Sequence, residues 1–362
     1  MTHPLPPKTG RPMSIVIALV ATLTVSACTA PPSGSDDPSG VSSDTDSPST
    51  IASGLDAPWS VAFIEDTAVI SERDSARILE LDDSGETREI GAVPGVQPRG
   101  EGGLLGIAVH EEHLYAFFTT ADDNRIVRFP VTGEPGSLGL GDPETVLSGI
   151  PAARTHNGGR IAFGPDGMLY ATTGDAGDTG LAQDVDSLAG KILRLTPEGD
   201  IPSDNPFPDA YAYSIGHRNP QGIAWDAGDT LYASEFGQDR WDELNVIEAG
   251  SNYGWPDVEG IADTDGFVDP VQQWEPAEAS PSGMTIAAGS IWIANLRGER
   301  LREIPLDDLT RSSEHGTGEF GRMRDAALGP DGAIWVLTNN TDGRGDPADT
   351  DDRLLRFEPP AE

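Results

Sequence analysis

The sequence predicts an all-β fold, a six-bladed β-propeller of four-stranded antiparallel blades. Two apolar stretches joined by a turn recur six times, starting at Ser60, Gly106, Arg160, Gly222, Gly283 and Asp325. A further short segment follows each copy, beginning at Ala76, Asn124, Gly190, Asp242, Glu299 and Asp352. Alternating polarity, β-branched and aromatic residues and Asp-Gly turns indicate strands. A repeat of roughly 40 to 60 residues is typical of propeller blades; the alternative is a β-sandwich with accidental self-similarity.

The composition fits one large, exported β domain, which we expect to cover residues 51–362. The net charge of −37, from 23 basic and 60 acidic residues, disfavours nucleic acids and anionic membrane surfaces as partners. The 43 glycines and 30 prolines supply the turns that many short strands require. No Gly-x-Gly-x-x-Gly opens a helix after a strand, so nicotinamide binding is also disfavoured.

The N-terminal segment predicts export and a lipid anchor. Two basic residues precede an apolar run at 15–25, which is too short to span a bilayer and resembles a signal peptide. The segment ends in Val-Ser-Ala-Cys, and Cys28 is the only cysteine of the chain. This resembles a bacterial lipobox and favours lipidation over a chance cysteine in a released leader. We therefore expect a lipoprotein signal peptide at 1–28, a disordered Pro/Ser/Asp tether at 29–50 and an extracytoplasmic protein anchored to the membrane.

Two polar loops that precede strands carry the first candidate chemistry. His156 lies in Thr-His-Asn-Gly-Gly-Arg, residues 155–160, where a neutral imidazole could accept a proton near pH 7. The alternative is a surface histidine. The run Gly-His-Arg-Asn-Pro-Gln-Gly at 216–222 sets Arg218 beside Asn219, a pair that suits a carboxylate or an ortho-dicarbonyl. Here the alternative is a solvated turn.

An acidic segment at 234–245, followed by Gly-Ser-Asn-Tyr-Gly-Trp-Pro at 250–256, indicates a cation site. Carboxylates interleaved with glycines and main-chain carbonyls are the oxygen ligands that Ca²⁺ takes from flexible loops. In so acidic a chain, a solvated surface is the alternative interpretation.

Basic residues are scarce, yet two of them, Arg322 and Arg324, stand two positions apart on a predicted strand. Residues i and i+2 share a strand face, so the two guanidinium groups would act together. With Arg218 and Arg297 in comparable loop-to-strand positions, they suggest a polyanionic small ligand, whereas a salt-bridged blade edge is the alternative.

In combination and in order, these motifs resemble one family. They are GEGGLLGIA at 100–108, HNGGRIAFGPDG at 156–167, GDAG at 174–177, GHRNPQG at 216–222, SEFGQDRWDELN at 234–245, GSNYGWP at 250–256 and GRMRD at 321–325. The chain resembles, from about residue 54 to residue 357, the soluble quinoprotein sugar dehydrogenases. This glucose/sorbosone dehydrogenase family consists of six-bladed propellers that use pyrroloquinoline quinone (PQQ) and calcium.

The resemblance implies a catalytic group. His156 is similar to the general base that takes the proton from the anomeric hydroxyl of an aldose, and Asp175 to the acid that orients this histidine. Arg218 and Asn219 match the pair that contacts the quinone oxygens, where Arg218 would stabilise charge on the reduced cofactor.

The resemblance also implies cofactor and metal ligands. Arg322 and Arg324 match the arginines that hold cofactor carboxylates, while Arg297 stands where the family commonly has lysine. The further cofactor contacts that it implies are Glu101 and Gln183. Glu101 replaces the glutamine of glucose-oxidising relatives, and Thr155 replaces an acidic residue of some relatives, so the preferred sugar is open. The implied calcium ligands are the carbonyls of Gly237 and Gln238 at the cofactor and Glu243 with the Tyr253 carbonyl at a second, structural site.

The sequence therefore predicts a lipid-anchored oxidoreductase that uses PQQ and Ca²⁺. Its aldose substrate would be oxidised to the lactone, and a quinone or respiratory carrier would accept the electrons. Two alternatives remain. A calcium-dependent lactonase on a related propeller would need no arginine cluster, and a cofactor-free surface propeller that binds glycan or protein is compatible with the fold alone.

Overall fold

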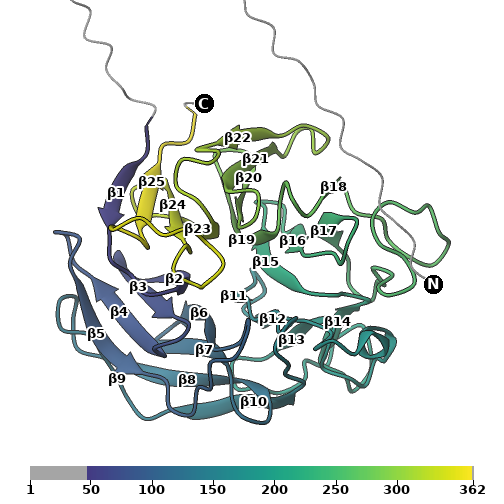
Figure 1. Ribbon diagram of the computed structural model, residues 1–362. Coiled ribbons are helices and arrows are strands. Elements are labelled where there is room, and N and C mark those ends of the chain that lie inside the picture. Colours follow the sequence, from purple (N-terminus) through teal and green to yellow (C-terminus); the bar gives the residue numbers. More distant parts are fainter. Residues whose placement is uncertain (1–46, 361–362) are drawn as a thin grey trace, which may run out of the picture. The chain divides into compact units, whose positions relative to one another are not determined.

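Six antiparallel sheets surround a central axis in the computed structural model, which describes residues 47–360 (Figure 1). Five sheets have four strands, and the sheet containing β6 has a fifth, β9 (Gly139–Leu140), at the side of β8. The one helix among the described residues is a short 3₁₀ helix, Thr179–Gln183. The predicted all-β, six-bladed propeller is confirmed.

The strands that line the axis come first in each blade. They are β2 (Pro58–Ile64), β6 (Leu104–His110), β11 (Ile161–Phe163), β15 (Pro220–Trp225), β19 (Pro281–Ala287) and β23 (Met323–Leu328). The second strands are β3 (Thr67–Glu72), β7 (His113–Thr119), β12 (Leu169–Thr173), β16 (Leu231–Glu235), β20 (Ser290–Asn295) and β24 (Ile334–Thr338). These two sets coincide with the sixfold apolar repeat of the sequence.

The third and fourth strands complete each sheet outwards. The third strands are β4 (Arg77–Leu81), β8 (Asn124–Thr132), β13 (Lys191–Leu195), β17 (Asp242–Ile247), β21 (Arg300–Pro305) and β25 (Leu354–Phe357). The fourth strands are β5 (Thr87–Ala92), β10 (Glu144–Ile150), β14 (Ala212–Ile215), β18 (Gln272–Trp274), β22 (Ser313–His315) and β1 (Ser49–Ala52).

The ring closes through β1, which pairs with β25 although the two strands lie at opposite ends of the chain. Ser49 pairs with Arg356 and Thr50 with Leu355. Closure of this kind joins the first and last segments in one blade and fixes the ring. The sheet thus includes two residues of the range expected to be tether. The predicted signal peptide, Cys28 and the rest of the tether lie outside the described residues, and no helix within 47–360 has the length and apolarity needed to cross a membrane.

Apolar side chains fill the spaces between neighbouring blades. One such cluster joins Phe117 and Ile126 of the β6 sheet to Ile161 and Leu193 of the β11 sheet, all of them buried. Burial of this area supplies most of the stability of a closed β fold. Packing between sheets leaves the loops at the ends of the blades free to carry function.

The axis itself is polar and ion-paired. Nη1 of Arg160, just before β11, lies 2.9 Å from Oδ2 of Asp325 in β23 and donates to Oγ of Ser60 in β2. The Arg160 guanidinium also lies 4.3 Å from the ring centre of Trp59. Because a buried charge is costly unless it is paired, these contacts link three blades at the centre of the ring.

Candidate active site

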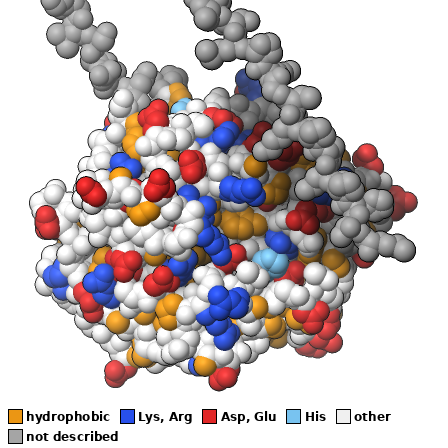
Figure 2. Space-filling model, in the orientation of Figure 1, with side chains coloured by type: hydrophobic (Ala, Val, Ile, Leu, Met, Phe, Trp, Pro, Cys, Tyr) orange, Lys and Arg blue, Asp and Glu red, His pale blue; other side chains and the backbone are white. Residues whose placement is uncertain are grey.

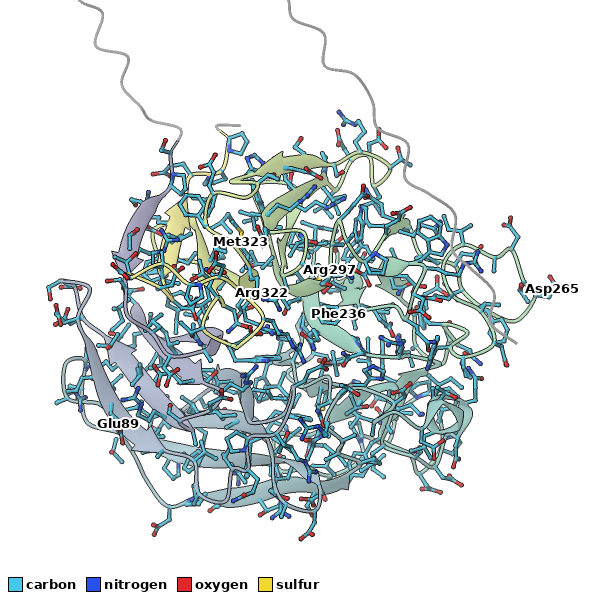
Figure 3. The ribbon with its side chains drawn as sticks, viewed as in Figure 1. Glu89, Phe236, Asp265, Arg297, Arg322 and Met323 are labelled. Carbon is cyan, nitrogen blue, oxygen red and sulfur yellow. The ribbon has the colours of Figure 1, made fainter. Side chains whose placement is uncertain are left out.

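Basic side chains gather near the middle of one face of the propeller, beside a histidine, whereas acidic side chains are spread over the rest of that face (Figure 2). Arg297, Arg322 and Phe236 lie near the middle of the ring, and Glu89 and Asp265 lie at its rim (Figure 3). In a chain of net charge −37, a local excess of positive charge at the blade mouths favours an anionic ligand there.

His156 stands in the loop between β10 and β11 with a left-handed backbone, φ 59°. This conformation is uncommon for a residue that bears a Cβ. Its N–H donates to Oε2 of Glu101 over 2.9 Å, and Gly158 and Gly159 continue the turn at positive φ. Strained backbone of this kind is frequent at functional sites.

Asp175, after β12, is buried and lies beside this histidine. Its Oδ1 lies 2.7 Å from Nδ1 of His156 and accepts the N–H of Gly177, while Oδ2 accepts Nε1–H of Trp255 over 2.8 Å. Burial alone would raise the pKa of Asp175, but the hydrogen bonds from His156 and Gly177, together with that from Trp255, outweigh it and lower the pKa below its ordinary value. Asp175 is therefore held as a carboxylate.

Arg218 lies on the other side of the imidazole. Its Nη2 is 2.9 Å from Nε2 of His156, and its Nη1 donates to the carbonyl of Phe236. Because a guanidinium can only donate, Nε2 accepts here and the ring proton resides on Nδ1, facing Asp175. The lone pair of Nε2 is thus directed into the site, as a general base requires.

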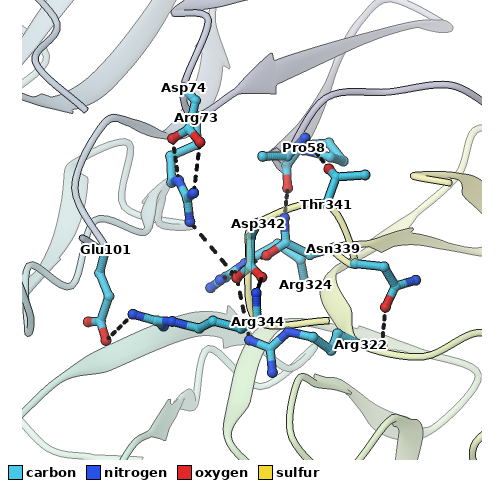
Figure 4. A network of polar contacts seen from close by, with 12 residues as sticks. Pro58, Arg73, Asp74, Glu101, Arg322, Arg324, Asn339, Thr341, Asp342 and Arg344 are labelled. Atoms are coloured by element: carbon cyan, nitrogen blue, oxygen red, sulfur yellow. Dashed lines mark hydrogen bonds and ion pairs between the residues drawn. The ribbon is translucent and has the colours of Figure 1, made fainter. Parts of the chain in front are cut away.

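Four arginines from three separated segments, Arg73, Arg322 with Arg324, and Arg344, lie around Asp342, in the loop between β24 and β25 (Figure 4). Oδ2 of Asp342 lies 3.5 Å from Nη2 of Arg322 and 3.9 Å from Nη1 of Arg73. Arg344, two residues further along, lies 3.3 Å from Oε1 of Glu101. Arg73 also pairs with Asp74 over 2.7 Å, so three carboxylates face the four arginines and a net positive charge remains.

Arg324 is the most deeply buried member of this cluster. Its Nη1 donates to Oε1 of Gln221 over 2.7 Å, and its Nη2 to Oδ1 of Asn339 over 3.3 Å. Burial lowers its pKa to about 9; the attraction of Asp342 opposes this effect, and the repulsion of Arg322 adds to it. An anionic ligand beside Arg324 would relieve this penalty.

Donor groups without partners concentrate in this site. Nine buried side-chain nitrogen or oxygen atoms within residues 47–360 have no hydrogen-bond partner, and four of them belong to residues that the sequence predicts as cofactor contacts. These four are Nε of Arg218, Nδ2 of Asn219, Nε of Arg322 and Nε of Arg324. Unpaired buried donors are costly, so their convergence indicates the place of a ligand rich in acceptor oxygens.

The predicted metal residues lie next to Arg218. Gly237, Glu243 and Tyr253 line with it a cavity of about 10 Å³, room for one water-sized species. Gln238 instead lines, with Arg297, a neighbouring cavity of about 500 Å³. Within the described part of the chain, no three His, Cys, Asp or Glu side chains are grouped so as to hold a metal ion.

Glu243 carries a marked electrostatic penalty. Burial, with the repulsion of Glu235 added, raises its pKa to about 8. Its two oxygens accept hydrogen bonds from Gly260 N–H and Asn245 Nδ2. A cation beside this carboxyl would favour its ionised form, so the donor set fits a cation that main-chain carbonyls help to bind.

Two predicted cofactor contacts are engaged by the protein itself. Glu101 bonds to the backbone of His156 and to Arg344, as described above. Gln183 donates to Oδ1 of Asn252 and the carbonyl of Trp255 and accepts from Nδ2 of Asn252. Gln183 thus supports the loop that carries Trp255, and the cofactor contact predicted for each residue stays a prediction.

Comparison with known proteins agrees with this arrangement. The family model described as glucose/sorbosone dehydrogenase matches residues 55–355. The chain belongs to the glucose/sorbosone dehydrogenase family. This confirms the predicted family and with it the predicted class of enzyme, a sugar dehydrogenase.

Three members of the glucose/sorbosone dehydrogenase family illustrate the similarity. A PQQ-bound aldose sugar dehydrogenase from Streptomyces coelicolor is 52% identical, with a TM-score of 0.83 over 86% of this chain and 96% of that one. An aldose sugar dehydrogenase from Escherichia coli is 30% identical over 79% of this chain and 88% of its own length. Quinoprotein glucose dehydrogenase B from Acinetobacter calcoaceticus is 32% identical over 55% of this chain and 49% of its own.

Four residues of this glucose/sorbosone dehydrogenase site were not predicted from the sequence. Arg73, Asp342 and Arg344 lie outside the quoted motifs, and no local pattern distinguishes them from surface charges. Trp255 lies within GSNYGWP, and that motif was the available signal. Its indole donates to Asp175 and lies 5.4 Å from the Arg218 guanidinium.

Proposed function

We propose that this protein oxidises the anomeric hydroxyl of aldose sugars to the lactone in a reaction that depends on PQQ and Ca²⁺. A quinone or another carrier would accept the electrons. The observation that carries the proposal is the set of four unpaired buried donors on Arg218, Asn219, Arg322 and Arg324, beside the unprotonated Nε2 of His156.

The residues present fit the cofactor. PQQ carries three carboxylates and two quinone oxygens, and the site offers guanidinium and amide donors that the protein leaves unpaired. Arg322 and Arg324 would hold its carboxylates, and Arg218 and Asn219 its quinone oxygens. When bound, the quinone supplies a two-electron acceptor for alcohol oxidation.

His156 would take the hydroxyl proton of the sugar at Nε2. Its Nδ1–H donates to Asp175, which fixes the ring orientation and stabilises the imidazolium that forms. The Arg218 guanidinium, now bonded to Nε2, would turn towards negative charge that develops in the site. The sugar and the cofactor would thus replace the contact between Arg218 and His156.

Calcium dependence is supported by the chemistry of the neighbouring residues. The raised pKa of Glu243 marks a place where a cation would stabilise the folded protein. The carbonyls of Gly237 and Gln238 are the proposed ligands at the cofactor, since Ca²⁺ accepts main-chain oxygens in flexible geometry.

A direct test titrates the apo-protein with PQQ, with and without Ca²⁺, and follows ultraviolet-visible absorbance. We expect stoichiometric uptake only when Ca²⁺ is present. Dye-linked oxidation of a panel of aldoses by the loaded protein, with lactone detected by NMR, then identifies the reaction. Absence of both uptake and sugar oxidation would reject the proposal.

The two alternatives account less well for the arginine cluster. A lactonase that works through a calcium-bound water has no use for Arg218, Arg322 and Arg324 around an oxygen-rich ligand. A glycan-binding propeller would not require His156 to be held between Asp175 and Arg218 in a strained backbone. Hydrolysis of a sugar lactone without PQQ would favour the first alternative.

The location of the protein is also a proposal. The lipobox-like sequence before Cys28 and the Pro/Ser/Asp segment after it support a lipid anchor outside the cytoplasm, joined to the propeller by a tether. Electrons from the sugar would then be delivered at the membrane surface, where quinones and respiratory carriers reside.

A further inference from the structure

A buried polar relay lies behind Arg218 and Asn219, and only the repulsion of its Glu235 on Glu243 has entered the chemistry so far. Oγ of Ser214, in β14, lies 2.8 Å from Nε2 of His217, and Nδ1 of His217 lies 2.8 Å from Oε2 of Glu235, at the end of β16. The order serine, histidine, carboxylate is that of a nucleophilic triad. However, Ser214 and His217 are fully buried, 0% exposed, so no substrate can reach the hydroxyl.

The other oxygen of Glu235 faces the active site loop. Oε1 accepts the main-chain N–H of Arg218 and that of Asn219, the latter over 3.1 Å. Arg218 contacts Nε2 of His156, and Oδ1 of Asn219 accepts the N–H of Gly158 over 3.0 Å. The carboxylate therefore fixes the main-chain amides of two consecutive residues, Arg218 and Asn219. The side chains of both residues contact the loop of His156.

His217 holds this carboxylate from behind. Its ring stacks on Tyr253, with 4.8 Å between ring centres and 20° between planes, and its N–H donates to the carbonyl of Gly190. The hydrogen bonds from Nδ1–H to Glu235 and from the Ser214 hydroxyl to Nε2 together set the orientation of the His217 ring. In only one rotamer are both carboxylate oxygens of Glu235 then hydrogen-bonded.

We propose that Glu235 and His217 are positioning residues for the Arg218–Asn219 pair, with Ser214 as the outer member of the relay. The inference rests on the proposed function, since it concerns how Arg218 and Asn219 of that site are held in position. A displacement of about 1 Å in such a group can lower turnover on the order of a hundredfold. Loss of the carboxylate also leaves two buried amides without acceptors.

The decisive comparison is Glu235→Ala with Glu235→Gln. Glutamine keeps an acceptor oxygen for the two amides, and its NH₂ group can donate to Nδ1 of the other His217 tautomer. We expect Glu235→Ala to weaken PQQ binding and to lower kcat at least about tenfold, with little change in KM for the sugar, and Glu235→Gln to restore most of both. His217→Ala should resemble Glu235→Ala, and Ser214→Ala should have a smaller effect.

Hydrogen exchange gives a readout that needs no cofactor. Peptides covering 216–222 should lose protection in apo Glu235→Ala and keep it in apo Glu235→Gln. Glu80→Ala is the matched control, because Glu80 is also buried, accepts the Gly136 N–H and pairs with Arg88, but lies in the outer part of another blade. It should lower the unfolding temperature without changing PQQ affinity or protection of 216–222.

Two results would overturn the proposal. Folded Glu235→Ala with wild-type protection of 216–222 and wild-type kcat would exclude a positioning role. A glutamine variant as impaired as the alanine variant would show that charge, and not amide positioning, is what Glu235 supplies. If the wild-type protein neither binds PQQ nor oxidises sugars, the proposed function fails, and the exchange pattern of the apo-proteins still decides whether Glu235 positions the loop.

Discussion

Nη2 of Arg218 lies 2.9 Å from Nε2 of His156, in a loop 62 residues away along the chain. The two residues precede the inner strands of adjacent blades, so the propeller brings their loops together at one mouth. This contact fixes the tautomer of His156 and leaves its basic nitrogen facing Arg218, in the position where a sugar hydroxyl would bind.

Replacement of His156 should separate turnover from cofactor binding. General-base catalysis contributes on the order of 10²- to 10⁴-fold, so His156→Ala should lose that factor in kcat while PQQ affinity changes little. Dye-linked oxidation and an absorbance titration measure the two quantities. His315→Ala is a suitable control because His315 also pairs with a carboxylate, Glu303, but lies on an outer strand. A loaded His156→Ala protein with near wild-type turnover would remove His156 from the mechanism.

Asp175 should make stability depend on pH in the acid range. The pKa of Asp175 in the folded state lies below the ordinary value. Its ionised form therefore stabilises the fold above about pH 4, the pKa of an aspartate in the unfolded chain. This contribution is lost as the pH falls through the folded-state pKa. The difference in unfolding free energy between apo wild type and Asp175→Asn should be largest near pH 7 and shrink below pH 4. Urea unfolding at several pH values measures it, and a difference that is constant with pH would contradict the assignment.

The inner three strands of each blade were predictable because they are short apolar runs, largely buried as in β12, β16 and β20, that recur with Asp-Gly or similar turns along the chain. The fourth strands were not. β5 exposes Thr87, Arg88 and Glu89, and β22 has only three residues with two exposed, so neither carries a hydrophobic period. The pairing of β1 with β25 depends on the ring as a whole, and no local signal indicates it.

The residues of the site divide in the same way, into those that a local sequence pattern indicates and those that only the closed ring brings together. His156, Arg218 and Asn219 lie in dense runs of glycine and polar residues that mark loops close to a ligand. Arg73 and Asp342 meet only because the ring closes, and each looks like an ordinary surface charge in the sequence. Glu101 and Gln183 were assigned from motif position alone, whereas their partners in the fold are protein groups.

The N-terminal prediction can be tested without reference to catalysis. Cys28→Ser should move the protein from the membrane fraction to the soluble fraction, because two hydrophobic chains are needed for stable anchoring and the variant carries none. Activity of the propeller domain per molecule should be unchanged, since the segment after Cys28 separates the anchor from the first strand. Immunoblots of fractionated cells report the distribution, and equal retention of both proteins in the membrane would contradict the lipobox.

Arg322 and Arg324 should supply much of the affinity for the anionic cofactor. A protein of net charge −37 would repel a tricarboxylate unless local positive charge exceeds the general field. Each charge-assisted pair contributes about 1.5 to 3 kcal/mol, so Arg322→Ala/Arg324→Ala should weaken PQQ binding at least about a hundredfold. Calcium binding through the carbonyls of Gly237 and Gln238 should persist, since main-chain ligands do not depend on these side chains.

A second pair of arginines provides the control for that experiment. Arg300 and Arg302 also stand two positions apart, in β21, but both pair with Glu314 of the outermost strand of their blade, β22. Replacing both of them by alanine removes the same formal charge from the chain as Arg322→Ala/Arg324→Ala. If the cofactor responds only to nearby charge, PQQ affinity should stay within about twofold of wild type, because charges beyond about 10 Å are screened at ordinary salt. Titration of the three apo-proteins with PQQ at fixed Ca²⁺ compares them. Equal weakening by both double variants would mean that net charge governs binding, and unchanged affinity in Arg322→Ala/Arg324→Ala would place the cofactor away from this cluster.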